Sequence, residues 1–248
     1  MHYLSVVLFY LFVVFGLINT VHLGLYLVGA NIYDIWQYRR RSRANAEDKQ
    51  DFPGVTVTIP AYNEELTIKR CLDSLLATKY PDLQVIVHND QSPDKTADIV
   101  RKYKRQHKEL DLRLVDRHQR VGKAGGLNYC IQKYAKHGLI MTLDADCVLK
   151  ADAIHKTVRY FDNPKVKAVA ANVRLMDERT ILGVLQRFEH MVGYRSKKFY
   201  SITNCEMIVG GVASTYRKKV LEQVGYYDQN TQTEDIGLSM KLASLGNK

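Results

Sequence analysis

The stretch Leu139-Ile-Met-Thr-Leu-Asp-Ala-Asp146 decides the fold, because an apolar run of strand length ends there in two carboxylates. A run of about four to eight apolar residues between polar ones is typical of a buried strand. Similar runs occur at Val55–Ile59, Leu83–Val87, Leu112–Val115 and Val166–Asn172. Helical patterns or helix-starting residues separate them at Ile68–Leu76, from about Pro93, and at Leu127–Lys136. The alternation predicts an α/β domain with a mostly parallel sheet and helices on both faces.

Polar residues follow the predicted strands at the point where each strand ends. In a parallel α/β sheet, ligands bind beyond the carboxyl ends of the strands. The residues that follow the first four strands are rich in carboxylates, amides and cations: Ala61–Glu64, Asp90, the loop with Lys123, and Asp144 with Asp146. The sequence therefore predicts one ligand site at this edge of the sheet.

Asp144 and Asp146 are the first candidates for a metal site. In an extended backbone, residues two apart point to the same side, so both carboxylates would face one cation. Mg²⁺ is usually held by one or two carboxylates together with substrate phosphates, and Mn²⁺ also suits oxygen ligands. The alternative is an Asp-containing turn before the next helix.

Asp90 and Lys123 are candidates for nucleotide contacts. A carboxylate after a strand can accept hydrogen bonds from a base or ribose, whereas Ser92 and Asp94 suit the cap of the next helix. Lys123 lies in a glycine-rich turn, Gly122–Gly126, before the helix predicted at Leu127. A helix start and a lysine favour phosphate, although the run matches neither common phosphate-loop pattern, and a turn without function is the alternative.

Glu234 and Asp235 precede a helical pattern at Ile236–Leu242. Carboxylates are favoured in a first helical turn by the helix dipole, which is a structural explanation for both. The functional interpretation is a general base that lies within hydrogen-bond reach of an acceptor hydroxyl.

The N-terminus carries a candidate membrane span. No Asp, Glu, Lys or Arg occurs from Tyr3 to Tyr33, and basic residues follow at Arg39–Arg43. The run exceeds the roughly 20 residues that cross a bilayer, and the basic flank predicts that the following domain is cytoplasmic. A cleaved signal peptide is the alternative, but the run is long and has no basic start. We expect a single span over residues 1–38, a basic and polar linker over 39–53 and a catalytic domain over 54–248.

The net charge of +10 indicates an anionic partner. Nucleic acid is one option, but the sequence has no recognised nucleic-acid module, and anionic lipid headgroups explain a basic flank beside a membrane span. The four cysteines lack zinc-binding spacing, which fits a reducing compartment. We therefore expect a lipid bilayer as a partner, at the plasma membrane, and no nucleic acid.

Taken together, these segments resemble the family 2 inverting glycosyltransferases, whose fold is the Rossmann-like GT-A domain. The resemblance rests on an ordered set of motifs: Ile59–Glu65, Asn89–Thr96, Gly122–Asn128, Leu143–Asp146 and Thr233–Asp235. The N-terminal span and the segment Ile208–Arg217 are most similar to the processive membrane branch, in particular to bacterial poly-N-acetylglucosamine synthases.

The resemblance implies a role for each matching position. Mg²⁺ or Mn²⁺ would be bound by Asp146 and Asp144, and Asp235 would be the catalytic base. The remaining residues would bind the two substrates: Ala61, Asn63, Glu64, Asp90 and Lys123, with Asp144, for a UDP-sugar donor, and Gly210, Gly211 and Glu234 for a glycan acceptor.

Three departures from the family pattern occur. Gln91 and Pro93 replace the usual Gly and Thr of the nucleotide loop, Arg120 replaces an Asn, and the chain ends before a Gln-x-x-Arg-Trp motif. The last point predicts a C-terminally incomplete enzyme. The expected activity is transfer of N-acetylglucosamine from UDP-N-acetylglucosamine to a growing β-linked polysaccharide. The alternatives are a single transfer to a polyprenyl-phosphate or lipid acceptor, and an inactive nucleotide-binding fragment.

Overall fold

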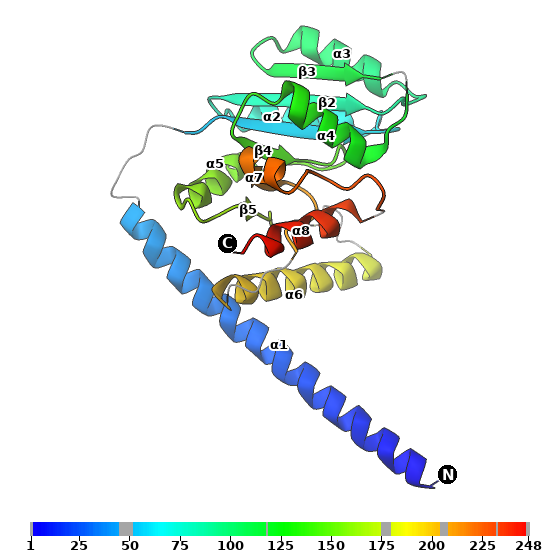
Figure 1. Ribbon diagram of the computed structural model, residues 1–248, viewed down its shortest axis with the longest axis vertical. Helices are drawn as coiled ribbons and strands as arrows, with labels where there is room; N and C mark the ends of the chain where they lie inside the picture. Colours follow the sequence, from blue (N-terminus) through cyan, green and yellow to red (C-terminus); the bar gives the residue numbers. More distant parts are fainter. Residues whose placement is uncertain are drawn as a thin grey trace. The chain divides into compact units, whose positions relative to one another are not determined.

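The computed structural model describes residues 2–44, 52–117, 119–174, 180–203, 208–231 and 233–246 (Figure 1). The chain divides into two compact units, one made of Met1–Asp48 with Asn172–Glu206 and the other of Lys49–Ala171 with Met207–Lys248. The sequence predicted residues 54–248 as one domain, whereas the unit that holds the sheet leaves out 172–206. The two units are described separately below.

The second unit is built on a six-stranded sheet with the order β3-β2-β1-β4-β6-β5. The strands are β1 (Val55–Ala61), β2 (Leu83–Asn89), β3 (Asp111–Asp116), β4 (Leu139–Thr142), β5 (Ala168–Val169) and β6 (Ser214–Arg217). Strands β1 to β4 are parallel, and β6 runs antiparallel to both β4 and β5. The predicted mostly parallel sheet is confirmed. The predicted fifth strand is only two residues long, and β6 was not predicted.

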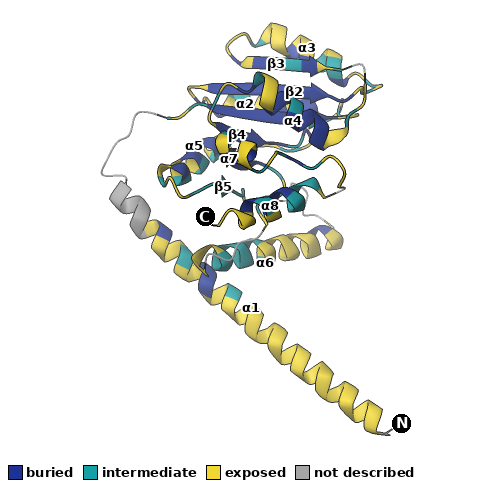
Figure 2. Cartoon of the chain, in the orientation of Figure 1, coloured by how far each residue is buried: buried dark blue, intermediate teal, exposed yellow. Residues whose placement is uncertain are grey.

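Helices cover both faces of this sheet (Figure 2). Along each strand, alternate side chains enter opposite cores: Val85 and Val87 pack with α2 (Ile68–Ala77), α3 (Thr96–Gln106) and α5 (Ala153–Val158). Ile86 packs on the other side with α4 (Gly122–Tyr134), α7 (Lys218–Gln223) and α8 (Glu234–Ser244). A short 3-10 helix, η1 (Arg159–Asp162), follows α5. Burial of both faces fits the apolar and β-branched residues that fill most positions of β1 and β2.

The register brings the ends of the central strands to one edge. Ala61 pairs with Asn89, and Asn89 pairs with Asp116, so β1, β2 and β3 end level with one another. In β4, Thr142 pairs with Thr58, and the next N–H, of Leu143, donates to the carbonyl of Thr58. The loops that follow all four strands therefore leave the sheet at the same edge.

The glycine-rich run is helix rather than turn, because α4 begins at Gly122 instead of Leu127. The reason is close packing of α4 on β2. A Cβ atom at Gly126 would lie 2.3 Å from Nδ1 of His88, so only glycine lets the helix approach the strand at this point. His88 is 1% exposed beneath it.

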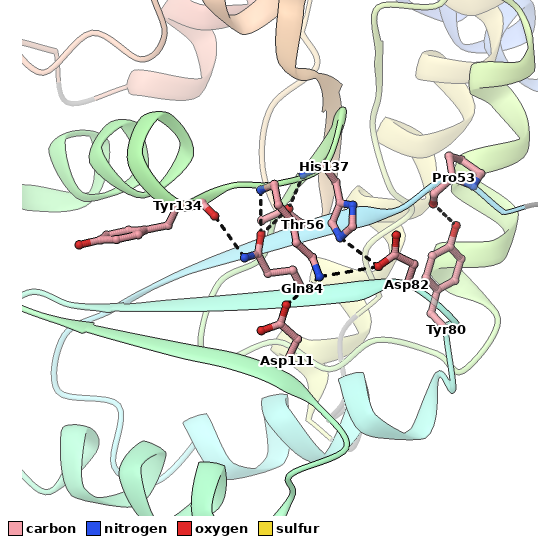
Figure 3. A network of polar contacts seen from close by, with 9 residues as sticks. Pro53, Thr56, Tyr80, Asp82, Gln84, Asp111, Tyr134 and His137 are labelled. Atoms are coloured by element: carbon pink, nitrogen blue, oxygen red, sulfur yellow. Dashed lines mark hydrogen bonds and ion pairs between the residues drawn. The ribbon is translucent and has the colours of Figure 1, made fainter.

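A polar network links the opposite, amino ends of the strands (Figure 3). The side chain of Gln84 accepts hydrogen bonds from Thr56 Oγ1 at 2.8 Å and Lys136 N at 3.0 Å, and donates to the carbonyl of Tyr134 at 3.1 Å. Beside it, Nε2 of His137 lies 3.4 Å from Asp82. The polar groups at the amino edge of the sheet are therefore bonded to one another.

The first unit is a pair of helices, α1 (His2–Ala44) and α6 (Ile181–Thr203). Within α1, Tyr3–Tyr38 is the one helical stretch of the described residues that is long and apolar enough to cross a membrane. The α1 backbone stays helical to Ala44, inside the predicted linker, while residues 45–51 lie outside the described residues. Helix α6, which was not predicted, packs on α1 through Tyr26–Tyr200 and Lys198–Asp34 contacts of 2.8 and 2.7 Å.

We predict that the sheet-bearing unit loses stability in mild acid. Burial lowers the pKa of His88 and of His137 below the ordinary value of 6.5. Between each lowered pKa and 6.5 the unfolded chain binds more protons than the folded one, so the free energy of unfolding falls as the pH drops through this window. Replacing His88 by Leu should reduce this loss. Denaturant titrations at about pH 7.5 and about pH 5.5 measure it, and an unchanged loss in His88→Leu would contradict the assignment.

Candidate active site

Lys123 joins three segments that are far apart in the sequence. It lies in the first turn of α4, and its Nζ is 3.0 Å from Oδ1 of Asp144, just beyond β4. The same Nζ is 3.3 Å from Oε1 of Glu234, the first residue of α8. Burial lowers the pKa of Lys123, but the negative charges of Asp144 and Glu234 outweigh this effect and raise the pKa above 10.5. The lysine therefore stays positively charged between the two carboxylates.

Asp235 lies next to this cluster in the first turn of α8. Its Oδ1 accepts a hydrogen bond of 2.8 Å from the N–H of Ile236. A Cβ atom at Gly210 would lie 2.7 Å from Oδ2 of Asp235, so the backbone at Gly210 approaches the carboxylate as closely as glycine allows. Gly211 follows with φ +91, a conformation that favours glycine.

Ser239 fixes the glycine segment against α8. Its Oγ accepts a hydrogen bond from the N–H of Val209 at 3.0 Å and donates one to the carbonyl of Asp235 at 2.7 Å. Ser239 is 2% exposed, so both bonds are shielded from water. The structure thus brings Gly210, Asp235, Glu234, Lys123 and Asp144 together through direct contacts or neighbouring positions.

Asp90 has a structural task that the sequence did not reveal. It is 5% exposed, and its two carboxylate oxygens accept hydrogen bonds from Val121 N at 2.8 Å and Gly122 N at 2.9 Å. These N–H groups belong to the start of α4, where the sequence predicted phosphate. The buried Asp90 carboxylate binds these N–H groups where phosphate was expected. It thereby fixes the loop before Lys123 to the end of β2.

Arg120 contacts both Tyr62 and Asp90. The guanidinium of Arg120 lies 3.9 Å from the centroid of the Tyr62 ring, and its Nε is 3.7 Å from Oδ2 of Asp90. Such stacking of a guanidinium on an aromatic face is attractive. Arg120, one of the departures from the family pattern, therefore links the loop after β3 to the loop after β1.

The loop after β1 is fixed to the loop after β2. The N–H of Asn63 donates to Oγ of Ser92 at 3.1 Å, and the N–H of Glu64 donates to Oγ1 of Thr96 at 2.8 Å. Ser92 thus binds Asn63, whereas Asp94 accepts a hydrogen bond of 3.0 Å from the N–H of Thr96, the first residue of α3. The N-cap position itself is Lys95, which makes no side-chain cap hydrogen bond. Ala61 at the end of β1 is buried.

Asp144 and Asp146 lie in a turn. Strand β4 ends at Thr142, and the N–H of Cys147 donates to the carbonyl of Asp144 at 3.1 Å, so the expected extended backbone is wrong. Asp144 is half-buried and Asp146 is exposed. The Cys147 thiol donates to Oδ1 of Asp146 at 3.1 Å, and burial, aided by Asp146, raises the pKa of this thiol to about 12.

The donor set fits a hard divalent cation that shares its ligands with a substrate. No group of three or more His, Cys, Asp or Glu side chains among the described residues is arranged to hold a metal alone. The half-buried Asp144 and the exposed Asp146 offer carboxylate oxygens, which suit Mg²⁺ or Mn²⁺ when phosphate oxygens supply other ligands.

Asn128 is a buried residue whose role was missed. Its Nδ2 donates to the carbonyl of Tyr227 at 2.8 Å, and its Oδ1 accepts from the N–H of Tyr227 at 3.0 Å. This pair joins α4 to the segment that leads to Glu234. An amide among the small and apolar residues of the buried face of α4 was the signal that could have identified it.

Residues 56–225 match the family model for Glycosyl transferase family 2, which covers more than half of the chain. The chain belongs to this family, and the prediction of a glycosyltransferase is confirmed.

The names of two relatives are more specific than the name of the family. A poly-beta-1,6-N-acetyl-D-glucosamine synthase of Staphylococcus epidermidis is 33% identical over 98% of this chain and 57% of its own length. The synthase of Staphylococcus aureus strain COL is 32% identical over 94% of this chain and 57% of its own length. The chain therefore spans little more than half of these relatives.

Two solved structures show the same fold. A mannosyltransferase of Pyrobaculum calidifontis in complex with GDP-Man and Mn²⁺ has a TM-score of 0.66 at 24% identity, over 92% of this chain and 65% of that one. TarS 1–349 of S. aureus in complex with UDP-GlcNAc has a TM-score of 0.57 at 18% identity, over 76% of this chain and 53% of that one. The predicted GT-A fold is confirmed.

We predict that Asn128→Ala lowers the free energy of unfolding by about 2 kcal/mol, because both backbone groups of Tyr227 lose a buried partner. Denaturant unfolding measures the change. Gln132→Ala, at an exposed position of the same helix, is the matched control and should change stability little. Equal effects of the two substitutions would show that the Asn128 pair does not hold α4 to this segment.

Proposed function

We propose that this chain is the catalytic part of a membrane-anchored inverting glycosyltransferase. It transfers N-acetylglucosamine from UDP-N-acetylglucosamine to a growing β-linked polysaccharide. The observation that carries the proposal is the bridge from Lys123 to Asp144 and Glu234, which connects the end of β4 with the start of α8. The substrate is supported by the names of the relatives, poly-beta-1,6-N-acetyl-D-glucosamine synthases.

On the donor side, Asp144 and Asp146 would hold Mg²⁺ or Mn²⁺ together with the donor diphosphate. When bound, the cation supplies Lewis-acid stabilisation of the charge that develops on the leaving diphosphate. Lys123 contributes a positive charge at the same place. Asn63 and Glu64, in the loop that follows Ala61, bind the uracil and ribose.

Asp90 contributes to donor binding because it holds the backbone at the start of α4 in place. Both of its oxygens accept N–H groups of the segment before Lys123, so it sets the position of that lysine. A carboxylate oxygen has a second lone pair, so Asp90 can also accept a hydrogen bond from the nucleoside.

On the acceptor side, Asp235 is the general base. Its Oδ1 is held by the N–H of Ile236, and its Oδ2 faces the backbone at Gly210. Asp235 takes the proton of the acceptor hydroxyl as that oxygen bonds to the anomeric carbon and the bond to the diphosphate breaks. Attack opposite the leaving group inverts the anomeric centre, so an α-linked donor gives a β-linked product. Glu234, Gly210 and Gly211 shape the acceptor position.

The anchor is helix α1. Its apolar stretch Tyr3–Tyr38 crosses the plasma membrane once, and the basic residues from Arg39 to Arg43 remain on the cytoplasmic side with the catalytic unit. This orientation gives the site access to nucleotide-sugars made in the cytoplasm.

We predict that Asp235→Asn lowers turnover by at least about 100-fold while UDP binding stays within about twofold, because the base is lost and the donor contacts remain. The assay follows UDP release from UDP-N-acetylglucosamine in the presence of oligosaccharide acceptor. Asp152→Asn is the control, because Asp152 is an exposed partner of Lys156 on α5. Turnover of Asp235→Asn equal to that of the unaltered chain would exclude Asp235 as the base.

A further inference from the structure

Lys123 occupies an unusual place for a residue expected only to contact the donor. Its ammonium group is 3.0 Å from Oδ1 of Asp144, the carboxylate proposed to hold the divalent cation. It also lies 3.3 Å from Oε1 of Glu234, whose side chain is only 15% exposed. The positive charge thus lies against one of the two carboxylates of the proposed cation site.

Asp144 and Glu234 need a positive charge between them, and the Lys123 ammonium supplies it. Two carboxylates brought together in a partly buried place repel each other, and an ammonium between them removes that repulsion. The Lys123 ammonium has three N–H donors, and the two contacts given above leave one donor for another anion. Lysine also has a long flexible stem, so its charge can move between neighbouring anions at little cost.

We propose that Lys123 is an internal counter-ion that competes with the divalent cation for Asp144. The cation binds tightly only when the donor diphosphate offers Lys123 another anionic partner. The diphosphate then serves both positive charges, because it receives the ammonium and adds oxygen ligands for the cation. This inference rests on the proposed function and adds a coupling between its two ligands. The metal and the nucleotide bind together, and neither binds well alone.

The coupling must be reciprocal. If the nucleotide raises the affinity for the cation by some factor, the cation raises the affinity for the nucleotide by the same factor. Removing the lysine charge should therefore have opposite effects on the two partners taken alone. Binding of the cation without nucleotide should become tighter, and binding of the nucleotide without cation should become weaker.

The test is a titration of the full chain in detergent with Mn²⁺, with and without UDP, in which electron paramagnetic resonance counts the free Mn²⁺. Lys123→Met removes the charge and keeps the length, whereas Lys123→Arg keeps the charge and is the matched control. Without UDP, Lys123→Met should bind Mn²⁺ about fivefold more tightly than the unaltered chain, which is the order expected for a partly exposed ion pair. The enhancement by UDP should shrink by a similar factor, and Lys123→Arg should keep most of it.

The outcomes separate this inference from the proposed function. If the unaltered chain binds no Mn²⁺ even with UDP, the proposed function fails. If it binds Mn²⁺ with UDP, but Lys123→Met binds Mn²⁺ alone no more tightly than before, only the counter-ion role is overturned. Denaturant unfolding checks that the variant is folded, and Lys123→Gln is a second charge-free variant with the same expected result.

Discussion

The ion pairs of Lys123 depend on a constraint of the fold: parallel neighbouring strands deliver their carboxyl ends to one edge of the sheet. Strand β4 ends before Asp144, and α4 begins after the loop that follows β3, so Asp144 and Lys123 reach the same point from different directions. Glu234 arrives from α8, much later in the chain, and completes the cluster with a contact of 3.3 Å. The end of β4, the start of α4 and the start of α8 therefore meet in a single charged site.

Three buried side chains around this cluster make hydrogen bonds to the backbone. Asp90 holds the start of α4, Asn128 joins α4 to Tyr227, and Ser239 holds the glycine segment against α8. All three side chains are at most 7% exposed, and buried hydrogen bonds of this kind are directional and costly to break. The position of Asp235 relative to Lys123 is thus set by buried amide and hydroxyl contacts, while the charged groups stay available to substrates.

Much of the fold followed from the sequence, because β1, β2 and β4 are buried along almost their whole length and consist mostly of apolar or β-branched residues. The failures have specific causes. Strand β6 is short and polar, and only pairing with β4 and β5 makes Ser214 and Thr215 fully buried. The start of α4 at Gly122 was read as a turn because glycine is a poor helix former, while its contact with His88 is invisible in one sequence. Local motifs supplied the candidate site residues, which stay a prediction. The hydrogen bonds from the N–H groups of Val121 and Gly122 to Asp90 depend on a contact between distant loops, which the sequence does not show.

The proposed function requires that Asp144 and Asp146 bind a nucleotide through a shared divalent cation. The most direct measurement is the affinity of the full chain for UDP with Mn²⁺ and with a chelator, for the unaltered chain and for Asp146→Ala. We predict metal-dependent binding of UDP that Asp146→Ala weakens by at least about tenfold, because one carboxylate ligand is lost. Binding that is equally strong with a chelator, or indifferent to Asp146→Ala, would contradict it.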